Sequence, residues 1–254
     1  QRARLLGSRL NVHSKVDTGM GRIGVLHQDA PVLARKISRL KNLRVEGIFT
    51  HLAIADKDKA FTEKQIRLFN HLVQQLKKEG IVIPLVHCAN SMGLIGFKNS
   101  HFNMVRPGLM IYGLTPKERL KLNLKPVLSL KTKVVFVKRV PSGCGVSYGH
   151  AYITKHPSTI VTLPIGYGDG YPRNLSNVAS ILIRGRRFKV CGRICMDQMM
   201  ADVGDFPVKA GDEVVLIGRQ AKIRISAEEL AKLSGTIPHE IVCGLGSRIP
   251  RVYT

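Results

Sequence analysis

The sequence has no tryptophan, and aromatic residues make up only 6% of its 254 positions. Acidic residues are also scarce, since 17 aspartates and glutamates stand against 40 lysines and arginines, a formal net charge of +23. So few aromatic side chains argue against a stacking platform for single-stranded nucleic acid. The basic residues are spread along the chain rather than gathered in an arm or finger. We therefore expect a solvated basic surface suited to anionic small molecules, and no nucleic-acid partner.

Long apolar runs are absent too. No stretch of about eighteen apolar residues and no charged-then-apolar leader occurs, so we expect no membrane association. The five cysteines are odd in number and scattered, which excludes the disulfide framework of a small secreted domain and favours a cytoplasmic protein. Cys191 and Cys195 lie four positions apart, but no second close Cys or His pair completes a tetrahedral site. We therefore expect no metal.

What is present in the first half is an alternation of strand-like and helical patterns. Apolar residues recur at helical spacing over residues 60–80, where Gly80 is placed to end the helix. Strand patterns occur on either side of it, at residues 12–16, 43–53, 81–91 and, as a short strand followed by a loop, 103–114. Strands that alternate with helices indicate a parallel sheet.

Each of these predicted strands ends in polar residues. In parallel βα units, functional residues sit where the strand gives way to the loop. Four polar ends in succession favour loops that converge on one site, as in a βα-barrel: Lys15 with Arg22, then His51, then Asn90 with Ser91, then Arg106.

The first of these ends crowds Lys15, Asp17 and Arg22 around Gly19 and Gly21. The stretch is open to three interpretations: a phosphate cradle, a solvated turn or a charged wall of the site. The glycines allow a tight bend. We expect Asp17 to support the turn.

The second half, from about Lys125, is rich in β patterns separated by Pro, Gly and Asp. Gly185 is placed at the turn of a hairpin, and Ser226 with Glu229 predicts a capping box at the start of a helix. The β patterns are residues 128–140, 158–171, 179–194 and 212–220. This half is predicted to be a mainly antiparallel β domain.

A complete eight-fold βα-barrel takes about 250 residues, and the first half offers roughly half of that. The chain also begins with Gln1 rather than Met. We therefore expect α/β plus β architecture: part of a (βα)8 TIM-type barrel over residues 1–125, followed by the β domain over residues 126–254. The chain is expected to be the C-terminal portion of a longer protein.

Seven motifs follow one another in order with regular spacing: HSKVDTGMGRIG, THLAIAD, HCANS, NMVRPGLMIYGL, GVSYGHAY, PIGYGDGYPR and GRICMDQMM. Over about Val12 to Tyr253, the sequence resembles the alanine racemase family. The resemblance implies an isomerase with pyridoxal 5′-phosphate as its cofactor. Such an enzyme interconverts L- and D-alanine by two-base exchange of the α-proton and supplies D-alanine for peptidoglycan.

The resemblance assigns the catalytic groups. Tyr148, in the V-S-Y-G motif, is one of two acid/base groups, and His51 and Arg106 tune it. A free tyrosine has a pKa of about 10 and needs cationic or hydrogen-bonding neighbours to act near neutrality. Arg106 faces the pyridine nitrogen of the cofactor, where a group that stays protonated makes the ring a weaker electron sink. Taken alone, Tyr148 is typical of a half-buried strand tyrosine and Arg106 of a surface ion pair.

The resemblance also assigns binding residues. Ser91, with backbone groups of Gly108 and Leu109, binds the phosphate, although Asn90 and Ser91 are also typical helix caps. Arg22 contacts the cofactor's ring oxygen and the substrate carboxylate. Lys15 is expected to support Arg22 as an N-carboxylysine, whose negative charge would orient the guanidinium.

A homodimer with shared active sites is implied as well, in which Tyr148 and Met196 reach into the partner's barrel. The Met196 N–H holds the substrate carboxylate, supported by Asp197, and Tyr167 lines the entrance. A methionine side chain alone is more often core filler. The assignment of Tyr167 is weaker, as are those of Asp56, Arg173 and Arg193, which match positions that line the entrance or support the site.

The sequence departs from the family pattern in two places. The lysine that forms the Schiff base lies in a K-A-N-A-Y-G-type motif, which does not occur here, and Lys15 belongs to a different motif. We therefore expect the segment to be inactive alone. Ser247 also stands before R-I-P-R, where several members carry a tyrosine that touches the phosphate.

Two alternatives stay open. One is a related pyridoxal-phosphate barrel enzyme, either a decarboxylase or a racemase of serine or of broad specificity. Decarboxylases of this barrel type resemble one another in an acidic residue at the position of Arg106, which argues against them. The other is a basic, non-enzymatic binding module, whose binding to nucleic acid would weaken steeply with salt.

Overall fold

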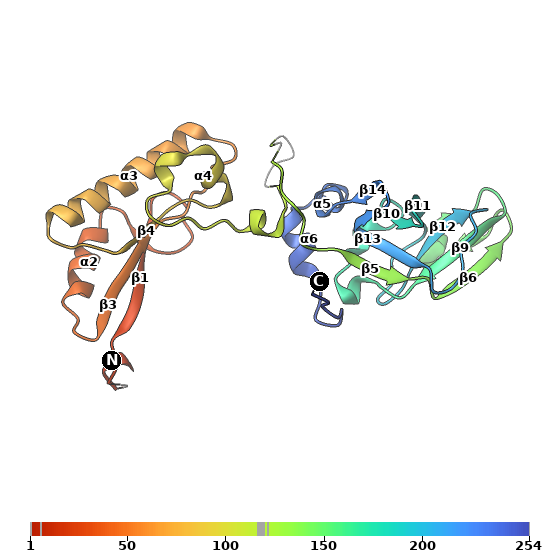
Figure 1. The fold of residues 1–254 in the computed structure, drawn as a ribbon, viewed down its shortest axis with the longest axis horizontal. Helices are drawn as coiled ribbons and strands as arrows, with labels where there is room; N and C mark the ends of the chain where they lie inside the picture. Colours follow the sequence, from red (N-terminus) through yellow and green to blue (C-terminus); the bar gives the residue numbers. More distant parts are fainter. Residues whose placement is uncertain (1, 6, 116–119, 121, 254) are drawn as a thin grey trace. The chain divides into compact units, whose positions relative to one another are not determined.

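The computed structural model describes residues 2–5, 7–115, 120 and 122–253. The chain divides into two compact units, Gln1–Ile111 and Tyr112–Thr254. We call them unit 1 and unit 2 and describe each by itself. Figure 1 colours unit 1 from red to yellow and unit 2 from green to blue.

Unit 1 is built on a parallel sheet of four strands in the order β2-β1-β3-β4. Its strands are β1 (Leu10–Asp17), β2 (Val25–Leu26), β3 (Leu43–Phe49) and β4 (Leu85–His87). Its helices are α1 (Arg2–Leu5), α2 (Ala30–Ser38), α3 (Lys59–Lys78) and α4 (Ser91–Gly96), with 3₁₀ turns η1 (Lys98–Ser100) and η2 (Leu109–Tyr112). Helix α2 connects β2 to β3 and α3 connects β3 to β4, so the predicted alternation and parallel sheet are confirmed.

Helix α3 forms where the sequence predicts it. The Asp58 carboxylate caps its first turn by accepting the Phe61 N–H at 2.9 Å. Gly80, with φ of +78°, lets the chain leave the helix, and the Ile81 N–H closes the end on the Leu76 carbonyl. The apolar face of the helix packs on Val16 and Ile48 of the sheet through Ile66, Phe69, Leu72 and Leu76. Each such side chain contributes about 1.5–3 kcal/mol when fully buried.

The strand predicted within residues 103–114 is wrong. That stretch makes only an isolated parallel bridge, Met104 to His87, and then the 3₁₀ turn η2. The Arg106 N–H donates to the Ala89 carbonyl at 2.9 Å, and Pro107 has no N–H to continue a ladder. The segment therefore bends over the end of β4 as a loop.

Unit 2 is dominated by an antiparallel sheet in the order β14-β13-β10-β11-β12-β9-β6, with β5 paired to β13. A separate pair, β7 (Gly145–Val146) and β8 (Tyr152–Ile153), flanks the Tyr148 loop. The strands of the large sheet are β5 (Leu130–Lys133), β6 (Phe136–Val140), β9 (Ser158–Leu163), β10 (Ser180–Ile183), β11 (Arg186–Val190), β12 (Met199–Gly204), β13 (Glu213–Gln220) and β14 (Ile223–Ile225). The predicted antiparallel β domain is confirmed.

The remaining elements of unit 2 are the short turns η3 (Tyr148–His150), η4 (Tyr167–Asp169) and η5 (Arg173–Leu175) and the helices α5 (Ala227–Ser234) and α6 (Pro238–Gly244). Arg184 and Gly185 both have positive φ between β10 and β11, which is the two-residue hairpin turn predicted at Gly185. Ser226 caps α5 by accepting the Glu229 N–H at 3.1 Å. Glu229 itself pairs with Arg187, so only half of the predicted capping box forms.

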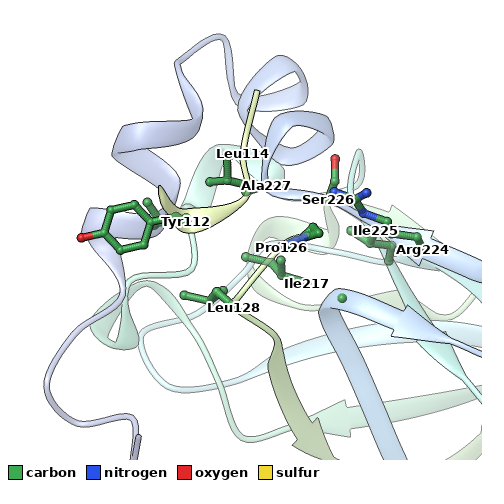
Figure 2. A pocket seen from close by; sticks show the side chains of 11 residues that line it. Tyr112, Leu114, Pro126, Leu128, Ile217, Arg224, Ile225, Ser226 and Ala227 are labelled. Carbon is green, nitrogen blue, oxygen red and sulfur yellow. The ribbon is translucent and has the colours of Figure 1, made fainter. Parts of the chain in front are cut away.

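At the start of unit 2, residues 112–114 pack against residues 125–128. Gly113 packs against the Lys125 carbonyl so closely that a Cβ there would lie 1.9 Å from it. Figure 2 shows the small hollow beside this contact, where Tyr112, Leu114, Pro126 and Leu128 face side chains of β13 and α5. None of the predicted site residues lines this hollow. Within the described ranges, no helix has both the length and the apolarity needed to cross a bilayer.

Candidate active site

The strands of unit 1 bring three side chains into one row at their carboxyl ends. Lys15 of β1 pairs with Phe49 of β3, and Phe49 pairs with His87 of β4. Residues at paired positions of a sheet project from the same face. His51 follows Phe49 by two residues and Ser91 follows His87 by four. Arg106 follows Met104, which forms an isolated parallel bridge with His87.

Arg106 is held from several directions. Its Nη1 donates to His87 Nδ1 at 2.5 Å, and its Nη2 donates to the carbonyls of Thr50 at 2.9 Å and Cys88 at 3.2 Å. The guanidinium also lies 5.5 Å from the centre of the Phe49 ring. Among the described residues, Arg106 has no carboxylate partner. A surface ion pair is therefore the wrong interpretation, and a half-buried cation is fixed at the strand ends.

His87, which the sequence interpretation missed, makes this arrangement possible. It is buried, and its ring stacks on Phe49 with centroids 5.0 Å apart and planes 6° from parallel. Burial, then the charges of Arg106 and His13, lower the pKa of His87 to about 4. The imidazole is therefore neutral near pH 7 and can accept from Arg106.

Lys15, His51 and Arg22 share the electrostatic neighbourhood of Arg106. Burial lowers the pKa of Lys15, with Arg22 and Arg106 adding to the shift and Asp17 opposing it. Burial also lowers the pKa of His51, followed by the charges of Arg106, Arg22 and Lys15. Such a concentration of cations favours an anionic ligand. Arg22 is exposed and has no hydrogen-bond partner among the residues that the structure describes.

Asp17 supports the turn, as predicted. Its carboxylate accepts the backbone N–H groups of Gly19, Met20 and Gly21 at 2.8–2.9 Å. The Gly19 N–H is the largest cause of a lowered pKa for this carboxyl. Because Asp17 already occupies these three amides, the loop is not a phosphate cradle, and the charged-wall interpretation remains for Arg22.

The candidate phosphate site lies between α4 and the Arg106 loop. Asn90 caps α4 by accepting the Gly93 N–H at 3.0 Å, which leaves Ser91 free for another role. The Ser91 hydroxyl accepts the Gly108 N–H at 3.1 Å, and in the described part of the chain its own proton has no acceptor. A Cβ added at Gly108 would meet nothing within 4 Å, so the space above the loop is open. The free hydroxyl proton of Ser91 and the open space fit a phosphate, and Leu109, the residue after Gly108, is buried.

In unit 2, a strained loop presents Tyr148 to solvent. Ser147, with φ of +66° and ψ of −177°, occupies a region that side chains rarely adopt, and Gly149 and His150 also have positive φ. Backbone strain of this kind persists only where the surroundings impose it, and it concentrates at functional sites. The Ser147 hydroxyl fixes the loop by donating to the Arg193 carbonyl at 2.7 Å. Tyr148 is 69% exposed, so the interpretation as a half-buried strand tyrosine is wrong.

Tyr167 and Met196 lie on two adjoining loops of unit 2. The Tyr167 N–H donates to the Cys195 carbonyl at 3.0 Å, and the Gly168 N–H donates to the Met196 carbonyl at 2.7 Å. Gly166 is required here because a Cβ would lie 2.2 Å from the Cys195 carbonyl oxygen. The Met196 side chain is 58% exposed and is not core filler. The Met196 N–H has no acceptor among the described residues.

The remaining predicted residues have few contacts that assign them a role. Asp56 is half-buried in the turn after β3. The exposed residues, all in unit 2, are Arg173, Arg193, Asp197 and Ser247. Within the part of the chain that is described, His, Cys, Asp and Glu side chains form no group that could hold a metal ion.

Fold and site together define a class: a partial βα-barrel with a cationic, phosphate-compatible site at its strand ends, followed by an antiparallel β domain. Comparison with known protein families supports this assignment of class. The family model "Alanine racemase, N-terminal domain" matches residues 1–116, and "Alanine racemase, C-terminal domain" matches residues 127–253. The chain belongs to the alanine racemase family.

Curated relatives and solved structures extend the match. The chain is 50% identical to alanine racemase of Halothermothrix orenii over 246 residues, covering 95% of this chain but 65% of that protein. It is 47% identical to alanine racemase of Symbiobacterium thermophilum, with 98% and 67% covered. Alanine racemase of Clostridium difficile 630 superposes with a TM-score of 0.93 at 39% identity, covering 99% of this chain and 66% of that one. The Bacillus anthracis enzyme with bound L-Ala-P gives 0.91 at 38% identity, with 100% and 67% covered.

Proposed function

We propose that this chain forms the larger part of a pyridoxal-phosphate-dependent alanine racemase that interconverts L- and D-alanine. The observation that carries the proposal is the fixation of Arg106 at the strand ends by His87 and two carbonyls, without a carboxylate partner among the described residues. Family membership supplies the reaction class, because the relatives that match are named alanine racemase. The proposal includes two domains, part of the cofactor-binding barrel over residues 1–125 and the β domain over residues 126–254.

The cofactor's phosphate would bind at Ser91 and the Gly108–Leu109 loop. The free hydroxyl proton of Ser91 and the open space over Gly108 are the features that support this assignment. When bound, pyridoxal phosphate acidifies the α-proton of an amino acid by withdrawing electron density from Cα into its ring. The guanidinium of Arg106 keeps its proton and does not transfer it, so beside the ring nitrogen it would limit that withdrawal. This would favour return of the proton to Cα, and hence racemisation, over side reactions.

Arg22 and Met196 would bind the substrate carboxylate. Arg22 is an exposed cation without a partner in the described chain, and the Met196 N–H lacks an acceptor there. Tyr167, 43% exposed, would narrow the entrance. The weaker assignments of Asp56, Arg173, Arg193 and Asp197 to the entrance and its support remain with this proposal.

Lys15, once converted to a carbamate, would orient Arg22. The neutral amine adds carbon dioxide, forming an N–C bond and releasing a proton to solvent, and the lowered pKa of Lys15 increases the neutral fraction. We expect ¹³C-labelled carbon dioxide to give a carbamate NMR signal that is lost in Lys15→Arg. A signal that persists in that variant would contradict the assignment.

Tyr148 would move the proton at its phenolic oxygen, with the neutral His51 and the cation Arg106 available to tune it. Tyr148, Tyr167 and Met196 are all exposed side chains on linked or strained loops. We propose that they complete the active site of a partner subunit in a homodimer. A cytoplasmic location, supported by five unpaired thiols, and a role in D-alanine supply for peptidoglycan belong to the same proposal.

The experiment uses a completed chimera, in which this chain is joined to the part of the Halothermothrix orenii relative that it does not cover. With pyridoxal phosphate and L-alanine, we expect the chimera to form D-alanine and the 254-residue chain alone to form none. A folded, cofactor-loaded chimera that does not racemise alanine would contradict the proposal. If the chimera turned over serine faster than alanine, the substrate assignment would change to serine, and the reaction would still be assigned as racemisation.

A further inference from the structure

A series of polar side-chain contacts runs from Arg106 along the sheet of unit 1 to a carboxylate: two hydrogen bonds, and then a contact at ion-pair distance. His87 Nε2 lies 2.9 Å from His13 Nδ1, and His13 Nε2 lies 3.4 Å from Glu46 Oε2. The second oxygen of Glu46 accepts from Asn11 Nδ2 at 2.8 Å. All these contacts lie within unit 1. We call Arg106, His87, His13 and Glu46 the relay.

The backbone is shaped to allow the relay. The pairing of β1 with β3 is regular up to Val12 and resumes at His13 with Gly47, so Glu46 is an extra residue in β3. A bulge of this kind redirects a side chain, here toward Asn11 and His13. Gly47 leaves room for the imidazole, since a Cβ there would lie 2.3 Å from His13 Nδ1. Neither feature is needed for a plain parallel pair.

The chemistry of the end members fixes every proton between them. Arginine has no acceptor, so His87 Nδ1 must accept from Arg106. A neutral imidazole with an acceptor at Nδ1 carries its proton on Nε2, which must then donate to His13 Nδ1. His13 consequently carries its proton on Nε2, facing the acceptor Glu46. The relay is therefore directional, and each member allows only one tautomer of the next.

We propose that His13 and Glu46 are positioning residues for Arg106, acting through the tautomer and orientation of His87. This inference rests on the proposed racemase function for its kinetic consequence, but the proton positions stand apart from it. Without His13, the buried Nε2–H of His87 loses its acceptor, and the ring gains other orientations in which Nδ1 no longer faces Arg106.

The first test is ¹⁵N NMR of the histidine rings, recorded on the 254-residue chain and on the completed chimera. We expect His87 and His13 each to carry a proton on Nε2 and none on Nδ1, with assignments from His13→Asn and from His71→Asn, an exposed histidine of α3. A proton on Nδ1 of either ring would overturn the relay. This readout decides the inference even if the chimera has no racemase activity.

The second test is kinetic and uses the completed chimera. We expect His13→Leu to lower kcat about tenfold with an unchanged KM for alanine. The reason is that Arg106 is proposed to face the ring nitrogen of the cofactor and not the substrate carboxylate. His13→Asn, whose Oδ1 can take the place of Nδ1, should restore most of the loss, and Glu46→Gln should retain more activity than Glu46→Leu. The matched controls are His71→Leu and Glu63→Leu on α3.

Two kinetic outcomes would overturn the proposal while the racemase function stands. One is a kcat of His13→Leu within about twofold of the parent. The other is an equal loss of kcat in His13→Leu and His13→Asn. That result would show that any change at this position lowers kcat, whether or not the new side chain offers His87 an acceptor atom. Thermal melting of each variant separates these results from unfolding.

Discussion

The two units present their candidate functional residues in opposite ways. In unit 1, Arg106, His87 and Asp17 are buried or half-buried, and each is fixed by two or more hydrogen bonds. In unit 2, Tyr148 and Met196 are more than half exposed, and the hydrogen bonds fix the backbone around them instead. The candidate residues of unit 1 are therefore held by side-chain contacts within their own unit, whereas in unit 2 the backbone is held and the side chains are exposed.

The largest expected effect concerns the exposed side of this comparison. Tyr148→Phe removes the phenolic oxygen and nothing else, so kcat of the completed chimera should fall about a thousandfold, the usual range for a lost acid/base group. Its melting temperature should not change, because among the described residues the phenolic oxygen has no hydrogen-bond partner whose loss would lower the stability. Tyr253→Phe, at a position 92% exposed, is the matched control. Equal activities of the two variants would remove Tyr148 from the chemistry.

A smaller effect is expected on the buried side. Gly47→Ala places a Cβ against the His13 ring, so we expect unit 1 to lose about 2 kcal/mol of unfolding free energy, as other overpacked sites do. Urea unfolding followed by circular dichroism measures this change. Gly96→Ala is the control, since a Cβ there meets nothing within 4 Å. Equal stabilities for the two variants would show that the His13 ring is not held as described.

The smallest effect is a pH dependence at the Asp17 turn. The folded pKa of Asp17 lies below its unfolded value of about 3.9, so its contribution is complete above that pH and is lost as the pH falls through the folded value. The stability difference between the parent and Asp17→Asn should therefore be constant near neutrality and shrink below about pH 4. A difference that does not change with pH would show that the three amides do not act on a charged carboxylate.

Much of the fold could be predicted because its signals are local. The α3 periodicity, the stop at Gly80 and the Gly185 hairpin each depend on a few neighbouring residues. The strand predicted over residues 103–114 was wrong because Arg106 donates its backbone N–H to Ala89, a contact made at long range. Apolar content alone did not reveal that the segment would leave the ladder.

The candidate site was predicted only in part, for the same reason. The motifs located Arg106 and Ser91, but not the partners that hold Arg106. His87 and His13 meet because of the strand register and the bulge at Glu46, and neither can be seen in a single strand. A search for polar residues at alternate positions of consecutive parallel strands would have found them.

The most direct test of the contrast between the units is complementation between two inactive variants. Completed chimeras carrying Arg106→Ala and Tyr148→Phe are mixed, dissociated and reassembled. If unit 1 supplies Arg106 and unit 2 of the partner subunit supplies Tyr148, each hybrid dimer contains one intact site, and racemisation should recover to roughly a quarter of the parent activity. If the mixture remains as inactive as its components although hybrid dimers form, Tyr148 does not complete the site of a partner subunit, and the account is contradicted.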